Sequence, residues 1–296
     1  MRGSWGYPCG VLQSDPAVSL LYMDLSWNKV KTLDMHALQP LRNLQKFTLW
    51  HSHLYQLQTA YMSSLEYLSF HQNGLQDFPA TCKSGTKQTL FPSLTELILD
   101  FNVISTIPDP VCLPKSEILS LACNRILYLS SYMFSISRFP SLSKVELTRM
   151  HGKFKQMKAY AFNNSRLAQI GLGVNYVDFS SSVVDSDIFA GCSGLRTLYL
   201  SYNNFKNVPD EKLHRLLRPL PRLEILHLAQ AQIESITCDT FRHLFQLKRL
   251  YLYRNALSSL PDGAFDRLPS LRYLSIGSSR ISKISSNTFG AQTRKR

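Results

Sequence analysis

Residues 247–274 read LKRLYLYRNALSSLPDGAFDRLPSLRYL, and the spacing of the apolar residues in this stretch decides the fold. The stretch fits the pattern L-x-x-L-x-L-x-x-N-x-L-x-x-L, with Leu250 and Leu252 as the central pair and Asn255 in the asparagine position. Leu271 then begins the same pattern again. A repeat of this kind gives a short strand, a turn and a return segment in each unit.

The same pattern runs through almost the whole chain of 296 residues. Its asparagine column falls at positions 28, 52, 73, 102, 124, 150, 175, 203, 231, 255 and 279. The intervals of 21 to 29 residues are those of a leucine-rich repeat. Because chance alternation does not give eleven matches in phase, we predict a solenoid of about 11 repeats over residues 18–290. A remnant N-terminal segment (1–17) and a basic tail (291–296) flank it.

The central L-x-L of each repeat places two apolar side chains on one face of a short strand. One coil cannot bury this face alone, so neighbouring coils must stack to form the core. Strands stack in parallel about 4.8 Å apart, more closely than the looser return segments, so the stack curves with the strands inside. The predicted fold class is therefore α/β, a curved horseshoe solenoid. Its parallel sheet lies on the concave face, and irregular or short helical segments lie on the convex face.

The column asparagine is the polar exception inside this core. Its amide donates to, and accepts from, turning backbone that would otherwise lack hydrogen-bond partners. Met150 occupies the column in the sixth coil and cannot make these bonds, so we expect that coil to be irregular. The polar insertion KSGTKQT at residues 83–89 predicts a loop that bulges from the third coil.

The phrase LSSLPDGAFDRLPSLRYL, with its x-x-L-P and A-F-x-x-L segments, resembles the extracellular repeats of Toll-like receptors and lamprey variable lymphocyte receptors. The uneven repeat lengths are more similar to a Toll-like receptor. The resemblance covers about residues 18–290. It implies a horseshoe ectodomain on the extracellular side of a single-pass membrane receptor, which recognises a microbial or self ligand and signals by dimerising.

Parts of the receptor pattern do not occur in this sequence. Cys9 stands alone before the first repeat, and no cysteine-rich cap, membrane helix or signalling domain follows Phe289. The opening residues also lack the continuous apolar core of a signal peptide. We therefore expect a fragment of a larger receptor, which would contact a membrane only through the missing regions.

Catalytic patterns do not occur in the chain. It has no G-x-S-x-G, no H-E-x-x-H and no glycine-rich phosphate loop. The eight histidines are scattered, and the six cysteines include no C-x-x-C pair. We therefore predict a non-enzymatic protein with no cofactor and no metal site.

The formal charge of +13 raises nucleic acid as a partner. Three positions in each repeat, two, four and six residues before the column, face the concave side. Their charged members are three basic and four acidic residues, namely Asp24, Lys46, Glu96, Asp100, Lys144, Glu146 and Arg249. A nearly neutral groove disfavours a nucleic-acid backbone there. Two basic stretches, 149–158 and 212–222, would serve a polyanion better, although such runs are usually only solvated surface.

Aromatic residues mark the concave face instead. Tyr199, His227 and Tyr251 occupy the same position in three successive coils, so we expect a lateral ladder. Tyrosine and arginine are favoured at binding hot spots, whereas the alternative reading is that aromatic residues simply suit strands. The candidate ligand-binding residues are Tyr199, His227, Arg249, Tyr251, Tyr253 and Tyr273. A second, smaller set comprises Trp50, Tyr67 and His71.

Two covalent modifications are predicted. Cys82 and Cys112 lie nine and ten residues past their columns in neighbouring coils, which suits the ~5.5 Å Cα separation of a disulfide. The rival interpretation is a buried free thiol at Cys112. Asn163 begins the one N-x-S/T sequon and is the candidate glycosylation site.

These observations favour a non-catalytic ligand-recognition segment of a Toll-like pattern-recognition receptor. Its partner would be a protein or microbial ligand on the concave face or edges, with receptor dimerisation as a consequence of binding. The alternative is a leucine-rich repeat scaffold or matrix protein that binds only other proteins.

Overall fold

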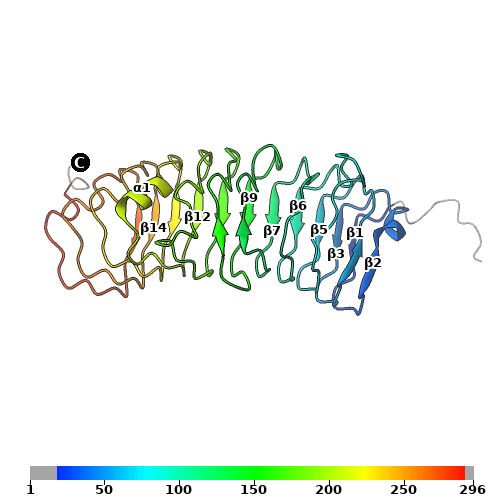
Figure 1. Ribbon diagram of the computed structural model, residues 1–296, viewed down its shortest axis with the longest axis horizontal. Helices are drawn as coiled ribbons and strands as arrows, with labels where there is room; N and C mark the ends of the chain where they lie inside the picture. The colour runs from blue at the N-terminus through cyan, green and yellow to red at the C-terminus, as the bar shows by residue number, and fades with distance from the viewer. Residues whose placement is uncertain (1–18, 291–296) are drawn as a thin grey trace, which may run out of the picture.

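The computed structural model describes residues 19–290, which form one continuous row of coils (Figure 1). The predicted segments 1–17 and 291–296 lie outside the described residues. A parallel sheet of 11 strands, one from each coil, runs the length of the solenoid. In order across the sheet the strands are β1 (Tyr22–Asp24), β3 (Lys46–Thr48), β5 (Tyr67–Ser69), β6 (Glu96–Ile98), β7 (Ile118–Ser120), β9 (Lys144–Glu146), β11 (Gln169–Gly171), β12 (Thr197–Tyr199), β13 (Ile225–His227), β14 (Arg249–Tyr251) and β15 (Tyr273–Ser275). The predicted curved solenoid is confirmed.

The nine sheet strands from β3 to β14 bury their central residues, whereas the central residues of the end strands β1 and β15 are only partly buried. The two outer residues of each strand face the concave side. In β14, Leu250 pairs with Leu226 of β13 and Leu274 of β15. Leu250 and Leu252 are fully buried, as the L-x-L pattern predicts. Full burial of one such side chain contributes about 1.5–3 kcal/mol, so the stack of central leucines is the main source of stability.

The convex side carries only short regular elements among the described residues. They are β2 (Thr32–Asp34) paired with β4 (Gln56–Gln58), β8 (Tyr128–Leu129) paired with β10 (Gln156–Met157), the 3-10 helix η2 (Met35–Leu38) and the helix α1 (Asp210–Leu217). These elements agree with the predicted irregular or short helical return segments.

Phenylalanine rings close the core from the convex side. Phe134 stacks on Phe162, and Phe162 on Phe189, with ring centroids 5.2 and 5.8 Å apart. Phe265 and Phe289 stack at 5.6 Å near the other end. Stacked rings seal successive coils together, because each ring contacts the equivalent ring of its neighbour.

The column asparagines link the coils along the sheet border where the chain leaves the strands. Asn255 donates from Nδ2 to the carbonyls of Leu228 and Leu252, at 2.8 and 2.7 Å. Its Oδ1 accepts the N–H groups of Ala231 and Ile233, both at 3.0 Å. The side chain therefore satisfies backbone of its own coil and of the preceding one. Nδ2 likewise donates to carbonyls of both coils at Asn73, Asn102, Asn124, Asn175 and Asn203.

The sixth coil departs from this regular linkage at Met150, as predicted. After the columns at 73, 102, 124, 203, 255 and 279 the next residue donates its N–H to a carbonyl two residues past the preceding column, as Arg125 does to Ile104 at 2.8 Å. In the sixth coil His151 donates instead to Asn124, at the preceding column itself, at 2.6 Å. The absence of an amide at Met150 thus coincides with a slip of two residues in the backbone pairing.

Candidate functional site

The predicted aromatic ladder is present on the concave face of the C-terminal coils. The parallel register aligns Tyr199 of β12 with His227 of β13 and with Tyr251 of β14. Ring centroids lie 4.5 Å apart for Tyr199 and His227, and 4.2 Å apart for His227 and Tyr251. Tyr273 of β15 extends the ladder at 5.1 Å from Tyr251, although its backbone partner is Arg249. Four coils therefore contribute rings to one continuous surface.

Three rings of the ladder are partly buried, and the ring of Tyr273 is more exposed. Tyr199, His227 and Tyr251 are partly buried because each ring covers the face of the next, while Tyr273 is 49% exposed. Burial between two tyrosine rings lowers the pKa of His227 below its ordinary value. The imidazole is therefore neutral at physiological pH, and the ladder carries no charge of its own.

The remaining predicted residues border the ladder on the same strands. Arg249 begins β14 and is exposed, whereas Tyr253 lies just past β14 and is partly buried. The carbonyl of Tyr253 accepts the N–H of Gln230 in the preceding coil at 3.0 Å. The structure thus gathers the six predicted ligand-binding residues on the concave face of four neighbouring coils. Their role in binding remains a prediction.

An ion triad that sequence reasoning missed flanks the ladder where the chain enters the strands. Glu224 accepts from Arg196 at 2.5 Å and from Lys248 at 2.7 Å, which bridges three successive coils. Hydrogen bonds from Lys248 and Arg196 lower the pKa of the Glu224 carboxyl. The three residues each stand seven positions before a column, so the repeat register could have revealed them.

The second aromatic set is larger than predicted. Trp50 and His71 are in ring contact at 6.2 Å, as two successive concave positions should be. Trp27 joins Trp50 at 5.2 Å, and Phe101 joins His71 at 5.0 Å. Tyr67, the third predicted member, lies at the start of β5. Trp27 and Phe101 were missed because each stands one residue before its column, whereas the predicted concave positions stand two, four and six residues before it.

The centre of the concave face lies between the two aromatic sets. It carries acidic side chains that accept hydrogen bonds from neighbouring hydroxyl groups. Asp100 Oδ1 accepts the Ser120 hydroxyl at 2.6 Å. Glu146 lies against Gly171, where a Cβ would collide with its carboxylate, and it accepts a hydrogen bond from the Thr148 hydroxyl. Burial raises the pKa of the Glu146 carboxyl, and the Thr148 hydrogen bond opposes that shift. These carboxylates are therefore part of the sheet surface rather than projecting charges.

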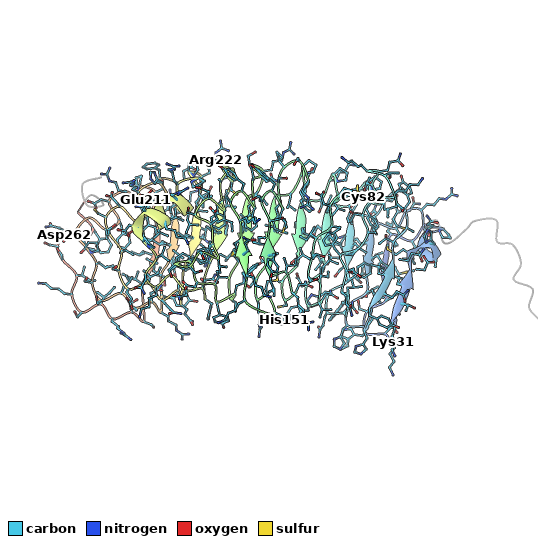
Figure 2. All side chains as sticks on the ribbon, viewed as in Figure 1. Lys31, Cys82, His151, Glu211, Arg222 and Asp262 are labelled. Atoms are coloured by element: carbon cyan, nitrogen blue, oxygen red, sulfur yellow. A yellow bond between two sulfur atoms is a disulfide. The ribbon has the colours of Figure 1, made fainter. Side chains whose placement is uncertain are left out.

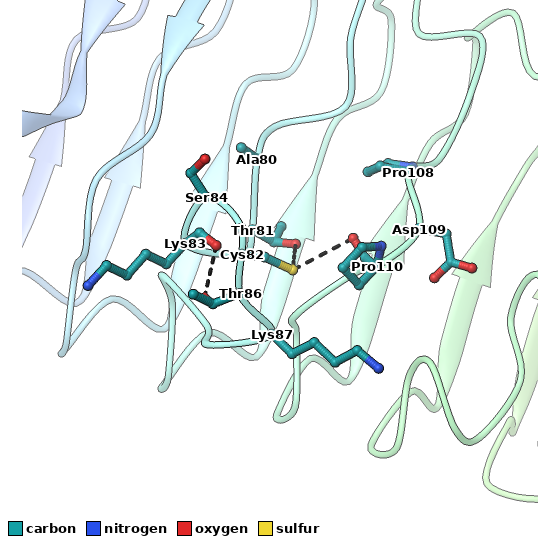
Figure 3. A pocket seen from close by; sticks show the side chains of 11 residues that line it. Ala80, Thr81, Cys82, Lys83, Ser84, Thr86, Lys87, Pro108, Asp109 and Pro110 are labelled. Atoms are coloured by element: carbon teal, nitrogen blue, oxygen red, sulfur yellow. Dashed lines mark hydrogen bonds between the residues drawn. The ribbon is translucent and has the colours of Figure 1, made fainter.

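A disulfide joins Cys82 and Cys112, with the two Cα atoms 5.0 Å apart. It links the third and fourth coils beside the insertion at 83–89, whose residues 83–88 are exposed. A pocket of about 480 Å³ opens at this place on the return side, with Lys83, Lys87 and Asp109 at its rim (Figure 3). The other described thiols, Cys123, Cys192 and Cys238, are free.

The candidate glycosylation site lies on the return side of the sixth coil. Asn163 is partly buried, and its side-chain carbonyl lies against Gly191, where a Cβ would collide with it. The Asn163 backbone carbonyl accepts the N–H of Ile136 at 3.1 Å. Glycosylation of Asn163 remains a prediction.

The remaining chemistry of residues 19–290 is sparse. That part of the chain holds no group of three or more His, Cys, Asp or Glu side chains that could bind a metal ion. None of its helices combines the length and apolar character needed to cross a bilayer.

Comparisons with known proteins identify the repeat class. A family model described as "Leucine rich repeat" matches residues 221–290, and one described as "BspA type Leucine rich repeat region" matches residues 123–216. Toll-like receptor 9 of Equus caballus is 26% identical over 242 residues, which is 75% of this chain and 22% of the relative. Podocan-like protein 1 of Homo sapiens is 26% identical over 229 residues, which is 75% of this chain and 36% of the relative. The chain thus spans between about a fifth and about a third of the length of these relatives.

Solved structures show the same fold. The Toll–Spatzle complex of Drosophila has a TM-score of 0.71 at 19% identity, covering 94% of this chain and 39% of that chain. The mouse RP105/MD-1 complex has a TM-score of 0.69 at 20% identity, covering 93% of this chain and 46% of that chain. The architecture is therefore shared at identities too low to transfer a ligand.

Proposed function

The chain belongs to the leucine-rich repeat proteins, and from this premise we propose that it is a non-catalytic ligand-recognition segment of a Toll-like receptor ectodomain. In its coarser form this is a protein-interaction scaffold, since leucine-rich repeat solenoids are typically binding domains. The relatives named as Toll-like receptors support the receptor assignment. The Cys82–Cys112 disulfide supports an extracellular location, because such bonds persist in oxidising compartments.

The observation that carries the proposal is the ladder of Tyr199, His227, Tyr251 and Tyr273. Stacking against neighbours fixes the rings, so a ligand that contacts them does not have to immobilise free rotamers. Tyrosine offers apolar area together with a hydroxyl that can bond across an interface. Neutral His227 adds no charge that a ligand would have to desolvate. These properties suit the apolar, aromatic centre of a protein–protein interface.

A positive charge lies beside the Tyr273 end of the ladder, which favours a ligand of mixed character. Arg249 lies beside Tyr273 in the register and is exposed. A ligand that packs on the rings could therefore also pair an acidic or carbonyl group with the guanidinium. A protein surface offers such a combination of apolar and acidic groups.

A matrix scaffold is the second candidate function. Podocan and podocan-like protein 1 match the chain at 29% and 26% identity, much as the Toll-like receptors do. A scaffold would use the same concave face but would not need to dimerise when its partner binds. The stoichiometry of the complex therefore separates the two candidates.

Tyr251→Ala tests the ladder. The full chain would be immobilised and exposed to purified microbial cell-surface proteins and secreted host proteins, and each binder would be titrated against the variants. Tyr251→Ala should weaken binding about 30-fold or more, as expected for a hot spot worth at least ~2 kcal/mol. Tyr251→Phe should retain most of the affinity.

Tyr176→Ala is the matched control, because Tyr176 is 65% exposed and lies outside the ladder. Equal affinity of a bound protein for Tyr251→Ala and for the wild-type chain would reject the ladder as its site. Sedimentation of the complex would then separate the two functions. Ligand-induced dimers support the receptor assignment, and monomeric one-to-one complexes support the scaffold.

A further inference from the structure

The two basic stretches lie on opposite borders of the solenoid. Arg222 precedes β13 and lies on the border where the chain enters the strands, which is the upper border in Figure 2. His151 follows β9 and lies on the opposite border, where the chain leaves the strands. Arg222 and His151 therefore lie on different borders, and the two stretches also differ in their contacts.

Two of the four Lys and Arg side chains in the stretch 212–222 are engaged within the fold. Lys212 Nζ donates to the Ser181 carbonyl at 2.7 Å, and burial lowers its pKa. Arg215 forms an ion pair with Asp187. This stretch also begins as helix α1, whose first turn carries two acidic residues. Lys212 and Arg215 thus hold the helix against the neighbouring coils, whereas Arg218 and Arg222 form no ion pair with another residue of 19–290.

The fifth and sixth coils, from the border where His151 lies to the convex strands β8 and β10, carry a cluster of cations that we name the exit-edge cluster. All five members are exposed, and none forms an ion pair with another residue of 19–290. They are Arg125, Arg149, Lys153, Lys155 and Lys158. The stretch 149–158 contains no acidic residue. The five cations are therefore not ion-paired, although Asp185 of the next coil lies alongside, its N–H donating to the Met157 carbonyl at 2.9 Å.

The backbone holds this cluster in place. Lys155 donates its N–H to the Leu127 carbonyl at 2.8 Å, and Lys158 donates to Leu129 at 2.9 Å, on either side of the β8–β10 pair. Gly152 has a φ of +124° and lies against the Leu127 side chain, a conformation that a residue with a Cβ rarely adopts. This turn follows directly on the backbone slip at Met150. The irregular coil therefore projects its lysines from a fixed segment.

We propose that the exit-edge cluster binds a sulfated polysaccharide. Repeated sulfate groups match an exposed set of lysine and arginine side chains that are not ion-paired. The disulfide between Cys82 and Cys112 indicates an oxidising, extracellular setting, where sulfated glycans are the polyanions of cell surfaces and matrix. This site is separate from the concave ladder and stands whether or not the ladder binds a ligand.

The aromatic residues beside the cluster argue for a polyanion without bases. The Lys155 ammonium lies over the Tyr128 ring, 5.8 Å from its centroid. Tyr132 and Tyr160 stack on each other at 5.7 Å. Single-stranded nucleic acids bind by stacking successive bases on open rings next to cations. Here Lys155 takes one face of Tyr128, and Tyr132 and Tyr160 take one face of each other, although all three rings remain exposed. The five cations outnumber the rings that are open for stacking, so charge is the main contact on offer.

The test uses the full chain and a fluorescent heparin hexasaccharide at physiological ionic strength. Lys153→Gln/Lys158→Gln removes two charges from the cluster, and Arg218→Gln/Arg222→Gln removes two from the opposite border. Each exposed ion pair contributes a factor of about two to five, so loss of two pairs should weaken binding of the first variant by about four- to twenty-five-fold. The second should bind like the wild-type chain. Lys153→Arg/Lys158→Arg should retain affinity.

Competing partners are titrated in parallel: a single-stranded oligonucleotide and a polyglutamate peptide, each of matched charge. Weaker binding of both, together with the selective loss in Lys153→Gln/Lys158→Gln, supports the sulfated glycan. Equal losses in the two Gln variants would show that only net charge matters and would overturn the proposal. So would tighter binding of the oligonucleotide or the peptide, or no binding of the hexasaccharide.

Discussion

Asn255→Ala would remove four hydrogen bonds at one point of the stack. Nδ2 donates to the Leu228 and Leu252 carbonyls, and Oδ1 accepts from Ala231 and Ile233. Asn255 is only 6% exposed, so water cannot readily take over these bonds. Each buried group left without a partner costs about 1–3 kcal/mol. With two N–H donors orphaned and some relaxation at the carbonyls, we expect a loss of about 3–5 kcal/mol.

Asn28→Ala is the matched control in the first coil. Asn28 occupies the same register but is exposed, and its Nδ2 donates to the carbonyls of Leu25 and Ser26 within its own coil. Water can replace both bonds, so the loss should stay below about 1 kcal/mol. Asn255→Ser should fall between the two variants, because Ser52 naturally fills the column and its hydroxyl accepts the Asn28 N–H at 3.2 Å.

Urea unfolding followed by circular dichroism measures the free energy of unfolding of each variant. Because repeat arrays can unfold in parts, hydrogen exchange gives the sharper readout. The amides of Ala231 and Ile233 should lose protection in Asn255→Ala, while distant amides keep theirs. If Asn255→Ala and Asn28→Ala destabilise the chain equally, the column does not act as an inter-coil link and the reasoning fails.

Three further perturbations test the covalent and titratable features. Cys82→Ser/Cys112→Ser should lower the free energy of unfolding by about 3–4 kcal/mol, because the unfolded chain no longer loses the entropy of a closed loop. The disulfide closes this loop across a sequence separation of 30 residues. An unchanged urea midpoint would contradict this prediction. Burial raises the pKa of the Glu146 carboxyl, so its contribution to stability is full below the unfolded pKa and is lost as pH rises through the folded pKa. The wild-type chain should therefore lose stability relative to Glu146→Gln as pH rises from about 4 toward neutrality, which urea titrations at several pH values would detect. In Gly171→Ala the added Cβ meets only atoms of that carboxyl group among its nearest neighbours, so the carboxylate should move into solvent and this pH dependence should shrink in the same titration.

The sheet could be predicted from the sequence because stacking requires the repeat pattern of each coil to align with that of its neighbours. Each coil buries its L-x-L pair only when the neighbouring pair lies alongside, as Leu250 does between Leu226 and Leu274. A one-residue slip would turn these side chains to the concave face, so the register is strongly specified. The same alignment predicted the ladder, since Tyr199 and His227 share one position of the repeat.

Other features depend on contacts that the repeat pattern does not encode. In every coil the residue before the column has a positive φ, between 51° and 60°, as in Trp27 and Val174. These are not residue types that favour a left-handed backbone, so no local signal marks the turn. The stacked coils impose it instead, and for that reason Trp27 and Phe101 escaped prediction as members of the second aromatic set.

In a solenoid, residues at the same position of successive repeats line up in a row on one surface. The residue types in each row therefore determine the properties of that surface. Rings in one concave row give the ladder, and amides in the column row hold the coils together. The exit-edge cluster arises differently, because Met150 interrupts the amide row and the next residues pair with a slipped register. A lost link followed by three unpaired lysines, Lys153, Lys155 and Lys158, is a cost in local order without a structural return. That cost is understandable if the displayed charge is itself used to bind a partner.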